Sequence, residues 1–303
     1  MDYPRILSLV EEYNKAIASL EQDAIARLTK SLDVSLEQLL KRLNSKYPDI
    51  KNNLSILPAQ RLLLITSELG ELLNIVSRSQ EEKHTEIFKG LITEGHRLGA
   101  EEATELVKMV DPNFEVASYS KVPIKAAAIA ASQTYKNLLG YGEQFANNAS
   151  NVISQGIIQG LGNRKIAGVL RAMEEKATKV QVERIVRTET ARAAIGAVKQ
   201  LYTDSDLRYG VWITTVQDVC PWCIGKSGKI YRIKDMVIPQ HFNCRCSILP
   251  VAPDWVRDGF FDFVAIDNYS EFVREGKRVR ADKALFEAAP PQEVTREKFL
   301  VAK

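Results

Sequence analysis

All four cysteines of the 303-residue chain lie in one short stretch, in the strings CPWC (Cys220 to Cys223) and HFNCRC (His241 to Cys246). Four cysteines scattered at random would share so short a window on the order of a few times in a thousand. In a reducing compartment such a cluster more often holds a metal than a disulfide. Because thiolate sulfur and imidazole nitrogen are the ligands that Zn²⁺ prefers, the spacing predicts one zinc site.

The string CPWC supplies two ligands, Cys220 and Cys223, since a Cys-x-x-Cys turn presents both thiolates to one ion. His241, Cys244 and Cys246 offer one ligand more than a tetrahedral site needs. Either His241 and one cysteine complete a site of three sulfurs and one nitrogen, or both cysteines complete a four-sulfur site. Two residues apart in an extended segment, Cys244 and Cys246 would point the same way, so both arrangements are geometrically allowed. We favour His241 as a ligand.

A site whose ligands all come from the protein is structural, so we expect a folding staple and no enzymatic activity. Two other interpretations of the cysteines stay open, a disulfide framework and a group of free, buried thiols. The alternative function is a zinc-containing nucleic-acid enzyme of the nuclease kind, in which His241 activates water and Asn243 lies near the metal. That reading lacks an adjacent Asp-His pair.

Helical patterns dominate the part of the chain that must carry this site. Apolar residues recur at three- and four-residue steps from Ile6 to Leu28, and a second apolar, Glu-rich block begins near Ala59. The glycines of the second block would weaken an isolated helix by up to about 1 kcal/mol each. They predict close helix contacts or short breaks at Gly70, Gly90, Gly95 and Gly99.

Two further helices are predicted at 164–175 and 180–202, followed by strands at 209–216 and 229–233, which are β-branched and aromatic. We expect the aromatic segment after Pro250 to form strands or turns against the zinc element. The predicted fold class is α+β, with mostly helical N-terminal and middle regions and a small zinc-stapled β-containing element near the C-terminus.

The charge balance gives little indication of a partner, because the formal net charge is only +3. Two local basic patches could contact double-stranded DNA, although such patches are more often solvated surface. Their candidate contact residues are Arg164, Lys165, Arg171, Arg274, Lys277, Arg278 and Arg280. No run of eighteen apolar residues occurs, and the acidic start differs from a secretory signal, so we expect a soluble protein without a membrane segment.

The string RIVRTETARAA precedes the strands and concentrates polar residues on an apolar helix. One interpretation is a solvated face on which Arg and Glu pair, worth a few tenths of a kcal/mol per pair. The other is that Arg187, Thr188 and Glu189 are held against the zinc element and satisfy buried groups there.

The order of motifs along the chain resembles the phage head morphogenesis family named after the Mu protein F. The motifs are a helical N-terminus, the string RIVRTETARAA, a strand with Trp212 and Thr214, and then DVCPWCIGKSGKIY and IPQHFNCRCSILP. The resemblance runs from about Gln155 to Pro250. The family positions present are Arg187, Thr188, Glu189, Cys220, Cys223, His241, Cys244, Arg245 and Cys246.

The resemblance implies a minor capsid protein of a tailed phage or prophage, present in few copies and associated with the portal, the major capsid protein and the capsid interior. Its location would be the virion head, and the host cytoplasm during assembly. Some members of the family bind DNA and influence its packaging. We expect a helical region at 1–115, the head-morphogenesis domain at 116–250 and an aromatic, charged tail at 251–303.

Overall fold

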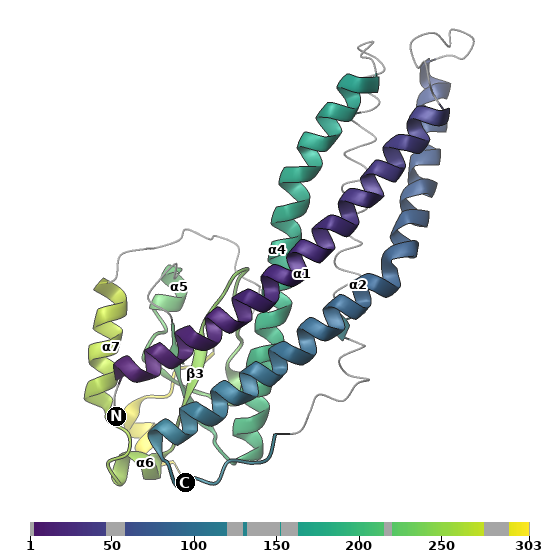
Figure 1. The fold of residues 1–303 in the computed structure, drawn as a ribbon. Coiled ribbons are helices and arrows are strands. Elements are labelled where there is room, and N and C mark those ends of the chain that lie inside the picture. Colours follow the sequence, from purple (N-terminus) through teal and green to yellow (C-terminus); the bar gives the residue numbers. More distant parts are fainter. Residues whose placement is uncertain are drawn as a thin grey trace. The chain divides into compact units, whose positions relative to one another are not determined.

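Three long helices make up most of the part of the chain that the structure describes: α1 (Tyr3–Lys46), α2 (Pro58–Val110) and α4 (Asn163–Asp204) (Figure 1). The structure is a computed structural model, and it describes residues 3–46, 58–119, 130–131, 152, 163–214, 220–275 and 291–302. A small antiparallel sheet and short helices follow α4. The predicted α+β class, mostly helical with a small β-containing element near the C-terminus, is confirmed.

The chain forms two compact units, which we describe separately. Unit 1 comprises residues 1–21, 91–127 and 187–303, and unit 2 comprises residues 22–90 and 128–186. Each of the three long helices therefore contributes one part to unit 1 and another to unit 2. The three domain ranges expected from the sequence stay predictions.

The sheet of unit 1 has three antiparallel strands, with β1 (Tyr209–Ile213) between β2 (Ile230–Arg232) and β3 (Ser247–Val251). Tyr209 pairs with Arg232 on one side and with Val251 on the other. The first two strands were predicted from their β-branched and aromatic residues. The third was not, because its Pro250 argues against a central strand, whereas an edge strand such as β3 tolerates proline.

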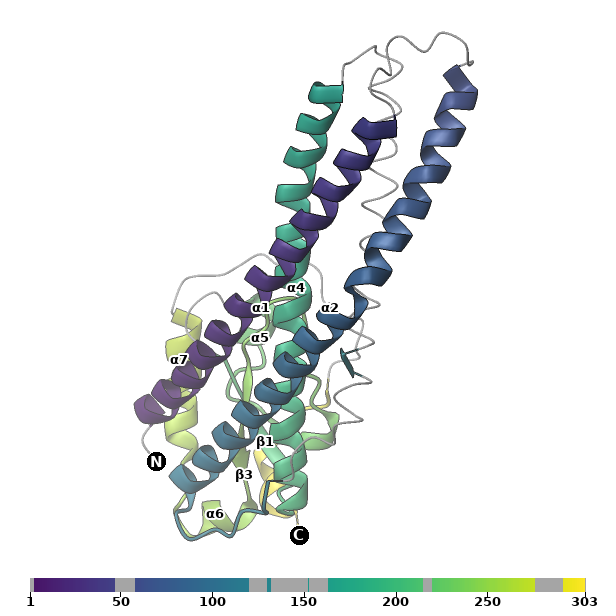
Figure 2. The same cartoon turned by 45° about the vertical axis from the view of Figure 1, so that its right-hand side comes forward.

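The core of unit 1 packs the sheet against parts of α1, α2 and α4. Its fully buried members include Ile6 and Val10 from α1, Leu106 and Val107 from α2, Val198 and Tyr202 from α4, and Trp212 and Leu249 from the sheet. Figures 1 and 2 show the beginning of α1 and the ends of α2 and α4 beside β1 and β3. The apolar stripe predicted in α1 therefore faces a sheet and two other helices.

Two expectations about secondary structure were wrong. The segments 164–175 and 180–202 belong to one continuous helix, α4, because the residues between them include neither Gly nor Pro to break it. The segment after Pro250 forms α6 (Pro253–Arg257) and α7 (Phe263–Glu275), not strands or turns. Its aromatic content suggested strands, but Ile266, Tyr269 and Val273 recur at helical spacing and are buried.

Helices α2 and α4 approach closely in unit 1 because α2 presents glycines to α4. An ideal Cβ at Gly95 would lie 3.1 Å from the Thr190 Cγ2 atom, and one at Gly99 would lie 2.1 Å from the carbonyl oxygen of Ala194. The expected close contact is confirmed at these two glycines. A Cβ at Gly90 would meet nothing within 4 Å, and the side-chain surroundings of position 70 lie outside the described residues.

Replacing Gly99 with alanine is expected to destabilise unit 1 by a net amount of about 1–2 kcal/mol, because a core methyl without room typically costs about 1–3 kcal/mol. The gain in helix propensity, up to about 1 kcal/mol, offsets only part of that cost. Urea denaturation of Gly99→Ala should be compared with Gly196→Ala, where the added methyl meets nothing within 4 Å. An equal or higher stability for Gly99→Ala would contradict the close approach of the helices.

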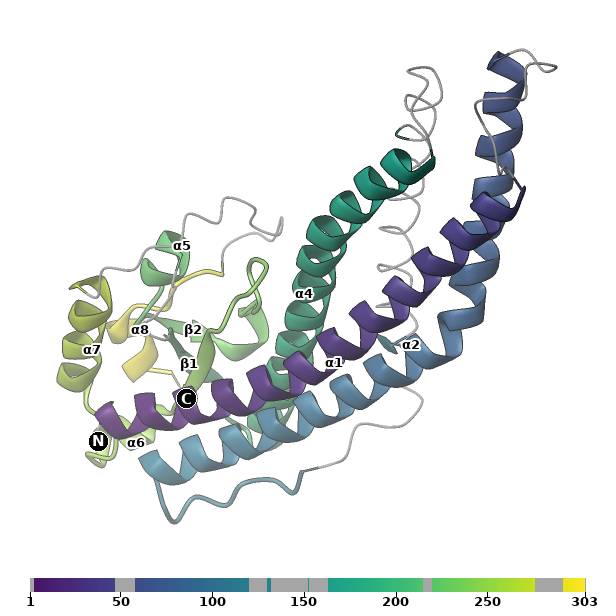
Figure 3. The same cartoon turned by 45° about the horizontal axis from the view of Figure 1, so that its top comes forward.

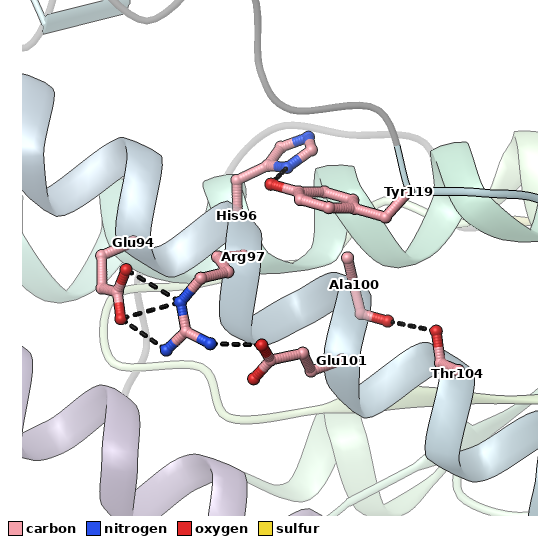
Figure 4. A network of polar contacts seen from close by, with 7 residues as sticks. All are labelled: Glu94, His96, Arg97, Ala100, Glu101, Thr104 and Tyr119. Atoms are coloured by element: carbon pink, nitrogen blue, oxygen red, sulfur yellow. Dashed lines mark hydrogen bonds and ion pairs between the residues drawn. The ribbon is translucent and has the colours of Figure 1, made fainter.

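The remaining two histidines make structural hydrogen bonds. In unit 2, His84 is buried on α2 and its Nε2 lies 3.0 Å from the Ser31 Oγ of α1. In unit 1, His96 Nδ1 lies 3.1 Å from the hydroxyl of Tyr119, so the segment after α2 runs back along that helix (Figure 4). On the same stretch of α2, Arg97 bonds to Glu94 and Glu101 (Figure 4). Neither histidine approaches the cysteines through these contacts.

No helix in the described part of the chain is both long enough and apolar enough to cross a membrane.

Candidate metal centre

The first arm of the site is the CPWC turn, which folds as the short helix α5 (Pro221–Ile224). Cys220 is its N-cap in extended conformation, and its sulfur accepts a hydrogen bond from the Cys223 backbone N–H at 3.3 Å. Pro221 at the first helical position has the fixed φ that this turn requires. The turn therefore brings both sulfurs to the same side, as the sequence spacing predicted.

The second arm is the turn that begins at His241 and leads into β3. Asn243 adopts the left-handed conformation, with φ of 62°, which asparagine tolerates better than most residues. The Cys244 N–H donates to the His241 carbonyl at 3.2 Å, which closes the turn. β3 starts immediately after Cys246 and pairs Ser247 with Ile213, so the sheet register fixes where this arm lies relative to β1.

The two arms meet in one buried cluster, which we call the Cys/His cluster: Cys220, Cys223, His241, Cys244 and Cys246. Its ligand atoms form two groups, each within 4.8 Å: Cys220, Cys223 and His241 in one, and Cys223, Cys244 and Cys246 in the other. All four cysteines are free thiols. Cys223 belongs to both groups and is the centre of the cluster.

His241 is oriented as metal-binding histidines usually are. Its Nε2 lies 3.4 Å from the Cys223 sulfur, and its Nδ1 lies 2.8 Å from the Phe242 carbonyl oxygen. A carbonyl that accepts from one ring nitrogen leaves the other as the ligand atom and fixes the ring.

Electrostatics in the Cys/His cluster favour charge separation. The contact with Cys223 is the largest of the causes that lower the pKa of the Cys220 thiol to about 4. Burial opposes the charged imidazole, but hydrogen bonds to Cys220 and Cys244 outweigh it and raise the pKa of His241 to about 11. Burial raises the pKa of Cys246. The pKa of Cys244 is lowered by its contacts, chiefly with Cys223, so the thiolate form is favoured at Cys220 and Cys244. Buried thiolates need compensating positive charge, which a divalent cation supplies.

The residues present fit a zinc ion on two grounds. They are soft or borderline donors, and their number meets the four that a closed tetrahedral site requires. The Trp212 indole N–H is buried and has no hydrogen-bond partner among the described residues, and its contact partly offsets the rise that burial causes in the pKa of Cys246. The Cys/His cluster can therefore hold a metal ion.

Three polar contacts attach the second arm to the long helices within unit 1. The Arg245 guanidinium, from between the last two cysteines, makes a two-pronged ion pair with Glu21 of α1. The Ser247 hydroxyl donates to Glu102 of α2 at 2.6 Å. Arg187 of α4 donates to the Asn243 side-chain oxygen at 3.4 Å. Each long helix thus holds one point of the arm.

Residues 147–249 match the model of the family described as Phage Mu protein F like protein. This stretch of the chain is a phage Mu F-like segment. The resemblance drawn from the sequence is confirmed for these residues. No curated protein and no solved structure matches the chain. The Mu F-like segment covers about a third of the chain and includes both arms of the Cys/His cluster.

The Arg-Thr-Glu string of the Mu F-like segment lies on α4 with three different environments. Arg187 contacts Asn243 of the second arm, which agrees with the interpretation that this string is held against the predicted zinc element. Thr188 is buried, and its hydroxyl has no hydrogen-bond partner within the described part of the chain. Glu189 pairs with Arg192 on the same helix, and burial raises its pKa. Arg187 thus contacts the turn that carries His241.

Sequence reasoning did not find Glu21 or Glu102, the two buried acids that hold the second arm. A signal was present, because Glu21 lies four residues after Ile17 and three before Ala24 on the apolar stripe of α1. Glu102 lies beside Ala103 on the buried face of α2. An acid on a buried face needs a partner, but the sequence does not say which one.

The candidate DNA contacts are only partly described. Lys165 is exposed on α4. Three others lie on described helices, but their side chains lie outside the described residues: Arg164, Arg171 and Arg274. The rest of the second patch lies wholly outside them: Lys277, Arg278 and Arg280.

Replacing Glu102 with glutamine is expected to remove a loss of stability that occurs as the pH rises toward about 7. Burial raises the pKa of Glu102 to about 7, against an ordinary value of 4.5. Between these values the folded state holds a proton that the unfolded state has lost, so unfolding free energy falls as pH rises and levels off above about pH 7. The shift corresponds to about 3 kcal/mol. Glutamine keeps an acceptor for Ser247 and has no proton to lose.

The measurement is urea denaturation of wild type and Glu102→Gln at several values between pH 5 and pH 8. The difference between them isolates Glu102 from other titrating groups. A stability difference that does not change across this range would show that Glu102 titrates at its ordinary pKa.

Proposed function

We propose that the chain is a minor capsid protein of a tailed phage or prophage, which acts in head morphogenesis. It would work in the virion head, and in the host cytoplasm during assembly, in few copies bound to the portal and the major capsid protein. The observation that supports this best is a Mu F-like segment whose Cys/His cluster is docked on three long helices. Such an arrangement offers a rigid element on helical surfaces, and it needs no active site.

The metal in this proposal is a structural zinc held by Cys220, Cys223, His241 and Cys244. The first three lie in one group, and Cys244 contacts both Cys223 and His241. Cys246 contacts Cys223 and Cys244 and is influenced by the Trp212 indole. We therefore place Cys246 beside the ligands, where its thiol contacts Cys223 and Cys244 and does not bind the ion. Bound zinc would cross-link the two arms. Arg245 and Ser247 attach the second arm to α1 and α2 through Glu21 and Glu102.

Metal content of the purified protein, measured by elemental mass spectrometry, tests this assignment. We expect about one zinc per chain in wild type, because one tetrahedral site uses four of the five donors. Cys246→Ser should keep zinc, whereas Cys244→Ser and His241→Ala should lose most of it. If His241→Ala kept its zinc and Cys246→Ser lost it, the result would instead support the four-sulfur site. Absence of zinc from wild type would contradict the staple altogether.

The competing function is a zinc-containing nucleic-acid enzyme that uses His241. Both nitrogens of His241 are engaged, one toward Cys223 and the other with the Phe242 carbonyl, and the side chain is buried. A general base must reach the water or substrate proton that it removes. Cleavage of plasmid DNA by wild type that disappears in a folded His241→Ala variant would favour the enzyme.

Partners are tested by co-purification with the portal and major capsid proteins of the same phage, using wild type and a metal-free variant. For DNA, the basic patches predict binding that weakens steeply with salt, because neutralised phosphates release counterions. Binding that stays constant between 50 mM and 200 mM salt, roughly the range in which such contacts weaken, would argue against the patches.

A further inference from the structure

Residues 291–302 form a strap that lies across unit 1 beside β2, α6 and α7. Glu293 makes an isolated antiparallel bridge with Tyr231, and the Val294 N–H donates to the Ile230 carbonyl at 2.9 Å. The strap then forms the short helix α8 (Arg296–Leu300), which packs against α6 (Figure 3). The strap therefore occupies the outer edge of β2, which would otherwise offer unpaired backbone groups.

A buried aromatic side chain anchors the strap, and the partly buried Val294 also packs against the core. Phe299 is fully buried, with its ring edge-on to Tyr209 at 5.3 Å and to Phe263 of α7 at 6.2 Å between centroids. The neighbouring Leu300 and Val301 stay exposed, at 40% and 79%. The strap thus binds as a peptide with one aromatic anchor, not as an integral layer of the core.

Charges of the strap match charges beside it. Glu293 pairs with Lys229 at 2.8 Å, and Arg296 pairs with Asp267 of α7 and lies over the Phe263 ring. These pairs are exposed, so they contribute more to register and orientation than to binding strength.

Packing between the strap and α7 is incomplete. A polar cavity of about 410 Å³ lies there, lined by residues of β2, α7 and the strap, among them Ile230, Ser270 and Thr295. Close packing without voids is the rule in protein cores, so this interface resembles a bound segment more than a core.

We propose that the surface formed by the β2 edge, α6 and α7 is an exchangeable docking groove, and that the strap of a second copy of the chain occupies it. The contacts named above join residues 293–299 to this groove, and Phe299 also reaches Tyr209 of β1. Residues 276–290 join the strap to α7, and fifteen residues can span up to about 50 Å when extended. The same strap therefore reaches a neighbouring copy with the same contacts. Head-to-tail exchange of this kind joins copies into rings or chains.

A labelled peptide of residues 291–303, titrated by fluorescence anisotropy into the full-length protein, tests the groove. In wild type the attached strap competes at high effective concentration. Phe299→Ala frees the groove, so this chain is expected to bind the peptide at least tenfold more tightly than wild type does. Val301→Ala, which changes an exposed residue of the same strap, should behave as wild type, and a peptide with Phe299→Ala should not bind.

A second test reverses the charges of the Arg296–Asp267 pair, and it does not require the Phe299→Ala variant to fold. A full-length Asp267→Arg chain should prefer a peptide with Arg296→Asp over the wild-type peptide. The proposal of a groove would be overturned if the wild-type peptide bound equally well to the wild-type chain and to a folded Phe299→Ala chain, or did not bind to the Phe299→Ala chain at all. It would also be overturned if the Asp267→Arg chain showed no preference between the two peptides.

Exchange between copies is tested with two full-length variants. In the Phe299→Ala variant the strap has lost its anchor, so the groove is open. In the double variant Lys229→Glu with Asp267→Arg the reversed charges of the groove repel the strap, so the strap is free to bind elsewhere. Their mixture is expected to form a one-to-one complex by light scattering that neither variant forms alone. If only the separate species appear at concentrations above the peptide's Kd, the strap acts only within its own chain and the proposal fails.

Discussion

Replacing Cys223 with serine is expected to abolish zinc binding and to destabilise unit 1 more than any other single change in the Cys/His cluster. Cys223 is the one cysteine that lies within reach of both groups of donors, and serine offers no thiolate. Structural zinc in small zinc domains contributes an apparent 10–16 kcal/mol or so of binding free energy. Unit 1 also has a large apolar core, so we expect a loss of several kcal/mol and not complete unfolding.

The loss is measured by thermal and urea denaturation, followed by circular dichroism, alongside zinc content. Cys246→Ser is the matched control, because it removes an equally buried thiol that we place outside the ligand set. A chelator should lower the melting temperature of wild type toward that of Cys223→Ser and leave the variant unchanged. If Cys223→Ser kept its zinc and its melting temperature, the central position of Cys223 would be refuted.

Replacing Arg245 with methionine is expected to cost about 3–5 kcal/mol, because it leaves the Glu21 carboxylate buried without its partner. Glu21 is 2% exposed, and both of its oxygens bond to Arg245. Removal of one member of a buried ion pair is far more costly than removal of both. The double variant Arg245→Met with Glu21→Leu should therefore recover most of the lost stability.

Arg296→Met is the matched control for this experiment. Arg296 also makes a two-pronged pair, with Asp267, but both side chains are about half exposed and such pairs contribute about 0–1 kcal/mol. Urea denaturation at neutral pH compares the three variants with wild type. A small effect of Arg245→Met, or no recovery in the double variant, would mean that the ion pair does not hold the second arm to α1.

These two predictions give separate roles to neighbouring family positions. In the proposed site Cys244 is the fourth metal ligand, whereas Arg245 contacts α1 and Ser247 contacts α2. Zinc content should therefore fall in Cys223→Ser and stay near one per chain in Arg245→Met, even though both lose stability.

The sequence by itself determined the features that depend on short spacings. A Cys-x-x-Cys turn places two sulfurs together through its own backbone, and an extended Cys-x-Cys does the same, so the cluster was predictable without a fold. Apolar periodicity likewise predicted the long helices, because each stripe must be buried somewhere. The order of motifs from Arg187 to Cys246 was enough to indicate the Mu F-like segment.

Only the tertiary structure decided which distant residues meet. Glu21 and Arg245 lie more than two hundred positions apart, and local spacing carries no information about such a pair. The same holds for Glu102 with Ser247, and for Gly99, whose missing side chain matters only because Ala194 of α4 lies against it. The helices α6 and α7 were not predicted, because the aromatic composition of this segment favoured strands and its helical spacing of apolar residues is short. The partners of these elements follow from how helices and sheet pack, which depends on long-range burial and not on neighbouring residues.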